Sequence, residues 1–187
     1  MSGGIITRKQ ILQRITNDQM ITNIPQAHGG ISSGDTICGY DVTLDTDFLS
    51  NGSSFTTIYP NGMGTKFFGS MRKKKSFSVG PGDILIAQTV EVFKMPLDLI
   101  GVGYQRAIYN NFGLTVSVPA LLPGYMGKAR FTLTNTSRNG IVITPGEGIF
   151  TMMFHTVSLA DGEVGEAYTG KYNGLDQIAV IPPSGGS

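Results

Sequence analysis

The fold is decided by the stretch LPGYMGKARFTLTN, residues 122–135. In its second half, apolar Ala129, Phe131 and Leu133 alternate with polar residues, so one face of a strand is buried and the other is polar. Its first half holds a Pro-Gly pair, in which proline fixes φ and glycine accepts a positive φ, as in a type II turn. This stretch therefore predicts a tight turn that leads into a half-buried β-strand.

The same pattern continues on both sides of this stretch, from Tyr40 onward. Short runs rich in Val, Ile, Thr, Phe and Tyr are separated by Gly, Pro and Asn, and further Pro-Gly pairs stand at Pro81 and Pro145. This pattern is typical of an all-β sandwich or barrel. The predicted strands are 40–44, 55–59, 84–93, 114–118, 129–135, 140–144 and 149–157.

The two ends of the chain differ from this β pattern. The residues Thr7-Arg8-Lys9-Gln10 fit a capping box, which predicts a helix over about 7–17, with Ile11, Leu12 and Ile15 as its apolar stripe. The Gly-rich tail, about 161–187, reads as an extended arm. With 187 residues and 40% hydrophobic content, we expect one domain, with a barrel over about 20–160.

Composition excludes several classes of protein. Charged residues make up 14% and the formal net charge is +1, so no global field attracts nucleic acid or an anionic membrane. The basic run at 72–75 is either a solvated turn or strand edge, or a contact to an acidic surface or a phosphate.

Because Cys38, His28 and His155 are the only residues of their kinds, we expect neither an internal disulfide nor a metal site. No signal peptide or membrane span is recognised, which predicts synthesis in the cytoplasm.

Several short motifs follow one another along the chain in a distinctive order. They are YDV at 40–42, PGD at 81–83 with TVE at 89–91, FGL at 112–114, PGY at 123–125 with Gly127, and PG at 145–146. Their order and spacing resemble the dUTPase and dCTP deaminase superfamily, and most closely the deaminase branch. The resemblance implies a distorted jelly-roll barrel that assembles as a homotrimer, with nucleotide pockets between subunits and the C-terminal arm closing over them.

Residues at the superfamily's working positions depart from its pattern. Arg106 matches the arginine that binds phosphate, but Ala107 and Ile108 stand in place of two phosphate-binding serines. Asn111 replaces a second arginine, and it carries no fixed charge. Thr132 stands where the deaminases have the glutamate that activates water, and threonine is not a base near neutral pH. Without the catalytic carboxylate and the phosphate-binding serines, we do not expect deamination by the usual route.

Two further positions of the superfamily's catalytic pattern are also replaced. The apolar pair Leu121-Leu122 occupies the place of the diphosphatase aspartate, and Thr151 that of a family glutamine within a core-like strand.

Asp41, Asp45 and Asp47 alternate near a strand end and could suggest a cation site. No EF-hand loop follows them, so we expect solvated carboxylates.

The tail resembles the deaminase tail in one segment. There Lys171 and Tyr172 match a lysine and a tyrosine that approach the triphosphate, so both are candidate anion-binding residues together with Arg106 and Asn111. The other interpretation is an arm that packs on the next subunit through Tyr168, Tyr172 and Ile178.

These observations favour a catalytically inactive homotrimer with a structural or binding role. Its most concrete form is a bacteriophage capsid decoration, or cement, protein on the virion surface, with no cofactor. One alternative is a divergent dCTP deaminase or dUTPase-type enzyme, which would use magnesium with its nucleotide and for which Arg106, Glu91, Lys171 and Tyr172 are the candidate residues. The other is a protein that binds nucleotide without turnover.

Overall fold

The computed structural model describes residues 4–26, 31–50, 72–73, 75–158, 165–170 and 173–174. Within them the chain is mostly β-structure with two short helices. The elements are α1 (Arg8–Asp18), β1 (Ile21–Thr22), β2 (Gly34–Asp35), β3 (Tyr40–Ser50), β4 (Arg72–Lys73), β5 (Phe77–Val79), β6 (Ile84–Lys94), β7 (Leu99–Gln105), α2 (Ala107–Asn111), β8 (Leu114–Ser117), β9 (Met126–Asn135), β10 (Ile141–Ile143) and β11 (Gly148–Thr156).

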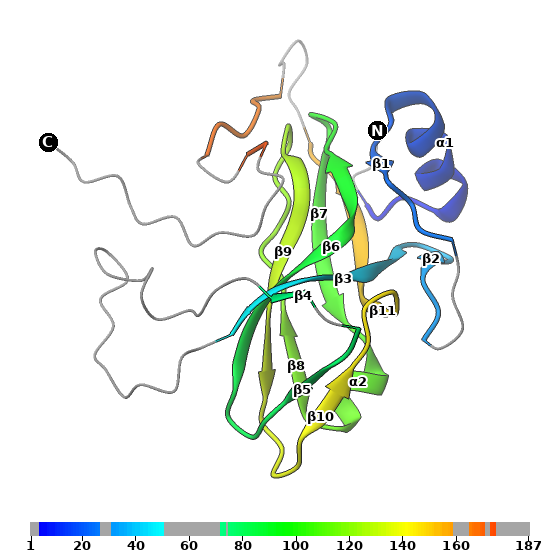
Figure 1. Cartoon of the computed structure of the whole chain (residues 1–187). Coiled ribbons are helices and arrows are strands. Elements are labelled where there is room, and N and C mark those ends of the chain that lie inside the picture. Colours follow the sequence, from blue (N-terminus) through cyan, green and yellow to red (C-terminus); the bar gives the residue numbers. More distant parts are fainter. Residues whose placement is uncertain are drawn as a thin grey trace, which may run out of the picture.

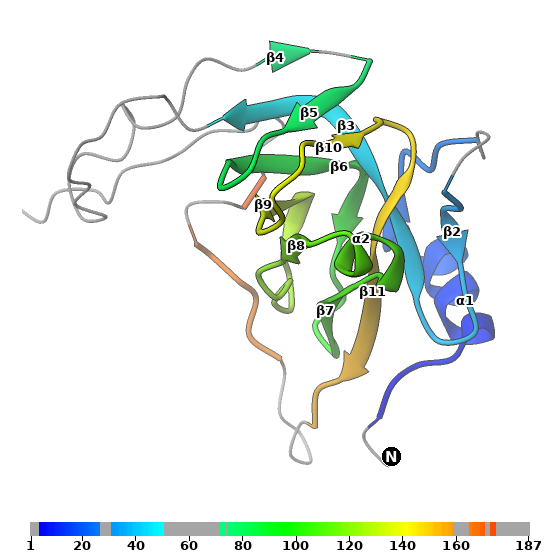
Figure 2. The ribbon, with the colours of Figure 1, turned by 90° about the horizontal axis from the view of Figure 1, so that it is seen from below.

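Nine of the described strands form one antiparallel sheet that nearly closes into a barrel (Figures 1 and 2). The strand order is β7-β11-β3-β6-β9-β8, with β1 added to β6, and β2 and β4 added to β3. The ends of this order meet because Gly101 and Leu121 exchange two backbone hydrogen bonds of 2.9 and 2.8 Å. Strands β5 and β10 pair separately, and α1 and α2 lie at opposite ends of the sheet in Figure 1. The all-β jelly-roll fold with a short N-terminal helix is therefore confirmed.

Closure of the barrel depends on glycine in β7. A Cβ atom at Gly103 would lie 2.6 Å from Cβ of Val118, and one at Gly101 would lie 3.0 Å from the sulfur of Met152. Both distances are shorter than normal contacts between carbon or sulfur atoms. Val118, after β8, can approach β7 this closely only because Gly103 has no side chain, and Met152 of β11 can approach it only because Gly101 has none.

The barrel interior is filled by alternate residues of the strands. In β9, Ala129, Phe131 and Leu133 are buried while the intervening residues are half exposed, as the sequence pattern predicts. Phe131 packs edge-on against Phe150 of β11, with ring centroids 5.1 Å apart. The turn before β9 has the predicted geometry, since Gly124 has a φ of 74°.

The predicted N-terminal helix is confirmed, with one error. It begins at Arg8 after the N–H of Thr7 donates to Oε1 of Gln10 at 2.9 Å, and Ile11 is fully buried. Leu12 was predicted to lie in the buried stripe but is 42% exposed, because α1 packs against the barrel through a narrower face than the sequence pattern indicates.

Most predicted strands are present, and the differences lie at their ends. Strand β3 runs on to Ser50, and β9 begins at Met126 rather than at residue 129. Strands β5 and β7 were not predicted. The predicted strand at 55–59 lies outside the described residues, as do the side chains of 72–74 in the basic run. In the described part of the chain, no helix has the length and apolar character needed to cross a membrane.

Candidate functional site

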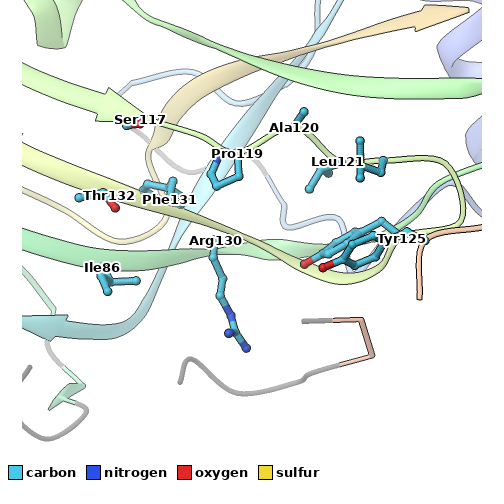
Figure 3. Close-up of a pocket in the computed structure, with 11 residues that line it drawn as sticks. Ile86, Ser117, Pro119, Ala120, Leu121, Tyr125, Arg130, Phe131 and Thr132 are labelled. Atoms are coloured by element: carbon cyan, nitrogen blue, oxygen red, sulfur yellow. The ribbon is translucent and has the colours of Figure 1, made fainter. Parts of the chain in front are cut away.

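A pocket of about 430 Å³ lies over the outer face of β9 (Figure 3). Strand β9 contributes Arg130, Phe131 and Thr132 to it. The remaining lining side chains come from four other places in the chain: Ile86 of β6, Ser117 of β8, the segment 119–122 with Tyr125, and Tyr168 near the C-terminus. Its size falls within the range of about 300–1,000 Å³ that is usual for small-molecule sites.

The floor of the pocket is a row of three residues across three strands. Thr132 is in register with Ser117 of β8 on one side and with Ile86 of β6 on the other. Because alternate residues of a strand face opposite sides, burial of Phe131 directs Arg130 and Thr132 to the outer face. The floor therefore offers two hydroxyl groups beside apolar surface.

Two tyrosine rings form one wall of the pocket. The ring centroids of Tyr125 and Tyr168 are 6.0 Å apart. The Tyr125 hydroxyl donates to the carbonyl of Lys128 at 2.7 Å, so the ring is held in place. Burial raises the pKa of Tyr125; the nearby Arg130 acts in the opposite direction and Tyr168 in the same one. Tyr125 therefore keeps its proton at neutral pH.

Tyr168 belongs to the C-terminal segment, which docks on the pocket of its own chain. Its N–H donates to the carbonyl of Pro123 at 2.7 Å. Farther along, the N–H of Gly174 donates to the carbonyl of Met126 at 2.8 Å. A subunit contact through Tyr168 stays a prediction, and the candidates Lys171, Tyr172 and Ile178 lie outside the described residues.

The pocket carries positive charge. Among the described lining residues Arg130 is the one charged side chain, and none is a carboxylate. Lys128 points to the same face of β9 but is bound to Asp45, with Nζ 2.6 Å from Oδ2. Burial alone would raise the pKa of Asp45, but hydrogen bonds from Lys128, from the Thr46 backbone and from the Gln88 side chain lower it overall. Asp45 therefore stays ionised and balances Lys128.

Arg106, the predicted phosphate-binding cation, lies outside this pocket and is bound within its own chain. Its guanidinium donates to the carbonyl oxygens of Ser32 and Gly148, and Nη2 lies 3.2 Å from Oδ2 of Asp41. Asp41 also accepts a hydrogen bond of 2.6 Å from the hydroxyl of Thr151. Arg106 thus joins the start of α2 to β3 and β11 in the single chain.

The sequence comparison gives the family of this fold. A family model described as dCTP deaminase-like matches residues 5–157. The chain belongs to the dCTP deaminase-like family. The match spans α1 and every strand of the barrel, together with most of the pocket.

Individual relatives agree with this assignment. The dCTP deaminase of Sulfurovum sp. (strain NBC37-1) is 28% identical over 158 residues, which cover 81% of this chain and 82% of the relative. The dCTP deaminase of Anaplasma phagocytophilum (strain HZ) is 25% identical over 174 residues, covering 91% and 94%. The crystal structure of 2′-deoxycytidine 5′-triphosphate deaminase from Agrobacterium tumefaciens shares the fold, with a TM-score of 0.66 and 13% identity. That match covers 84% of this chain, which spans about half, 49%, of the Agrobacterium chain.

The prediction of a catalytically inactive capsid decoration protein is wrong. The family match and the relatives named dCTP deaminase favour the alternative, a nucleotide-metabolising enzyme, and nothing supports a capsid partner or a virion location. The error was to treat the joint loss of several motif residues as loss of the activity. A site is defined by the side chains that meet in space, and in this deaminase-like chain a lined pocket persists around Thr132.

Glu91, the candidate from the TVE motif, is a structural residue of this deaminase-like barrel. Its side chain is fully buried, and both carboxylate oxygens accept the N–H of Thr43, at 3.1 and 3.0 Å. Burial raises its pKa to about 7, although the hydrogen bonds from Thr43 oppose this. Glu91 ties β6 to β3 inside the barrel and does not line the pocket.

Two further predictions can be placed. Asn111 is exposed at the end of α2, away from the pocket lining. The expectation of solvated aspartates is wrong for Asp41 and Asp45, because β3 continues past them and neighbouring strands cover both side chains. Within the described residues, no group of three or more His, Cys, Asp or Glu side chains could hold a metal ion.

Proposed function

We propose that this chain is a divergent nucleotide enzyme of the dCTP deaminase type, with its substrate in the pocket over β9. The reaction would add water to the pyrimidine ring of dCTP and release ammonia, giving dUTP. The observation that supports this proposal best is the position of the pocket. It surrounds Thr132, the position that the family resemblance gives to the deaminase's water-activating group, in a chain similar to named dCTP deaminases over 158 residues.

The lining suits a flat heterocycle. The rings of Tyr125 and Tyr168 offer an aromatic wall, and aromatic surfaces stack favourably on nucleobases, by about 1–3 kcal/mol per base. The hydroxyls of Ser117 and Thr132 can each donate and accept hydrogen bonds with the polar edge of the base or with a water molecule.

Thr132 sets the expected rate. A threonine hydroxyl can hold a water molecule in place but does not take its proton near neutral pH, whereas a positioned general base contributes about 100- to 10,000-fold. We therefore expect turnover that is slow compared with an enzyme that has a carboxylate at this position.

We further propose that the enzyme is a homotrimer. Tyr104 at the end of β7, Ile108 in α2 and Phe112 directly after α2 are 44%, 44% and 68% exposed in the single chain. Three large apolar side chains exposed within nine residues of sequence are a candidate subunit contact. Light scattering should give about three times the chain mass of 19.9 kDa, and the double variant Ile108→Asp, Phe112→Asp should give the single mass. A monomeric wild-type protein would contradict the trimer.

The function is tested with purified protein, dCTP and magnesium, by chromatography of the nucleotides and an assay for ammonia. A parallel incubation with dUTP detects diphosphate cleavage. Ala120→Phe fills the pocket and should abolish product formation. Val142→Phe makes a similar change on β10, where the side chain is 67% exposed, and should have no effect. Nucleotide binding without any product, or a product that Ala120→Phe leaves unchanged, would overturn the proposal.

A further inference from the structure

We propose that Ser117 and Ile86 fix the orientation of the pyrimidine ring in the pocket, an inference that rests on the proposed function. The two residues lie on either side of Thr132, Ser117 as its register partner in β8 and Ile86 as its register partner in β6. All three line the pocket (Figure 3). Neighbouring strands are about 4.8 Å apart, so these side chains form a row about 10 Å long across the pocket floor.

The two ends of this row differ in chemistry. Ser117 is exposed, and its hydroxyl makes no hydrogen bond to another residue in the described part of the chain, so it can donate one to a ligand. Ile86 is half-buried and offers only hydrocarbon. Thr132 lies between them and carries a second hydroxyl. The floor is therefore polar at the β8 end and apolar at the β6 end.

The reacting edge of cytosine has the same asymmetry. Its C4 atom, which water attacks in a deamination, lies between N3, a hydrogen-bond acceptor, and C5, an apolar C–H group. With C4 over Thr132, the ring can lie along the row in either direction. In one direction N3 accepts from the Ser117 hydroxyl and C5 contacts Ile86; in the other, N3 faces a side chain without a donor and loses its hydrogen bond. The row therefore selects the first orientation.

Altered nucleotides test the Ser117 end of the row. Isothermal titration of the full chain uses dCTP, 3-deaza-dCTP, in which a C–H group replaces N3, and 5-methyl-dCTP, and chromatography afterwards verifies that each nucleotide is intact. Ser117→Ala should weaken dCTP about 3- to 10-fold, the contribution of one neutral hydrogen bond, and 3-deaza-dCTP less than about 2-fold. Ser117→Thr keeps a hydroxyl and should bind dCTP more tightly than Ser117→Ala.

The added methyl group tests the Ile86 end. Ile86→Ala leaves space beside C5, so the affinity for 5-methyl-dCTP relative to dCTP should rise about 10-fold or more. Ile37→Ala makes the same change at a side chain that is 86% exposed and does not line the pocket, and it should leave this ratio unchanged. Ser117→Ala should also leave it unchanged, because Ser117 lies at the opposite end of the row. Circular dichroism verifies that each variant is folded; if Ile86→Ala is not, Ile86→Val should raise the ratio by a smaller factor.

The outcomes separate this inference from the proposed function. If the wild type binds dCTP but either Ser117→Ala or Ile86→Ala leaves its own ratio unchanged, the orientation is refuted while the pocket stands. If Ile86→Ala, rather than Ser117→Ala, removes the distinction between dCTP and 3-deaza-dCTP, the ring lies in the opposite direction and the inference is again wrong. If the wild type binds none of the three nucleotides, the proposed function and this inference both fall.

Discussion

Replacement of Glu91 by glutamine should remove a large part of the pH dependence of stability. The carboxyl group is fully buried between β6 and β3, and burial raises its pKa to about 7 from the usual 4.5. The charged or titratable groups that act near it are Asp45, paired with Lys128, and Tyr40, whose own pKa is raised, first by burial and then by Glu91. Glu91 is therefore the group in this cluster expected to titrate near neutral pH.

The sign and the size follow from these two pKa values. Below pH 4.5 the carboxyl group is protonated in both the folded and the unfolded chain, so it does not affect their balance. As the pH rises towards about 7, the unfolded chain releases the proton while the folded chain retains it, and stability falls. The pKa of Glu91 differs by about 2.5 between the folded and the unfolded chain, and each pKa unit corresponds to about 1.36 kcal/mol. The free energy of unfolding therefore falls by about 3 kcal/mol, and this decrease is complete above about pH 7.

Urea unfolding followed by circular dichroism from pH 4.5 to pH 8 measures this loss. The glutamine variant stays neutral and still offers an oxygen to the N–H of Thr43. Between pH 4.5 and pH 8, the wild type should therefore lose about 3 kcal/mol of its free energy of unfolding that the variant retains. Glu166→Gln makes the same change on an exposed side chain and should leave the pH dependence as it is. Parallel curves for the wild type and Glu91→Gln would refute the reasoning.

Three further changes test the fold and the site. Arg106→Ala leaves Asp41, which is 8% exposed, without its cation and should lower the free energy of unfolding in urea by about 3 kcal/mol. A second change, Asp41→Asn, should restore part of this stability. Gly103→Ala places a methyl group 2.6 Å from Cβ of Val118 and should cost about 1–3 kcal/mol in the same assay, whereas an unchanged stability would mean that β7 and the segment after β8 are farther apart than described. Thr132→Glu places a carboxylate on the pocket floor and should increase the rate of dCTP deamination by about 100-fold or more. An unchanged rate would mean that the cytosine ring of the substrate does not lie over this residue.

The strands that sequence reasoning found are those with a strong side-chain pattern. Alternation identifies β9, and the turn before it, because Phe131 and Leu133 must be buried while Arg130 and Thr132 are not. Strand β7 was missed because glycine at alternate positions erases the apolar pattern and resembles a loop. The structure gives the reason for one of these glycines, since a side chain at Gly103 would collide with the segment that closes the barrel.

The site was harder to predict than the fold, because its residues converge from distant parts of the chain. Motif comparison selected Arg106, but its partner Asp41 lies 65 residues earlier in the chain and only the folded structure shows that they pair. Tyr168 reaches the pocket from the C-terminal segment by a backbone bond that no local pattern reveals. Arg130 could have been found: it stands beside Thr132 on the polar face of a predicted strand, and that face lies at the position that the resemblance gives to the deaminase's catalytic glutamate.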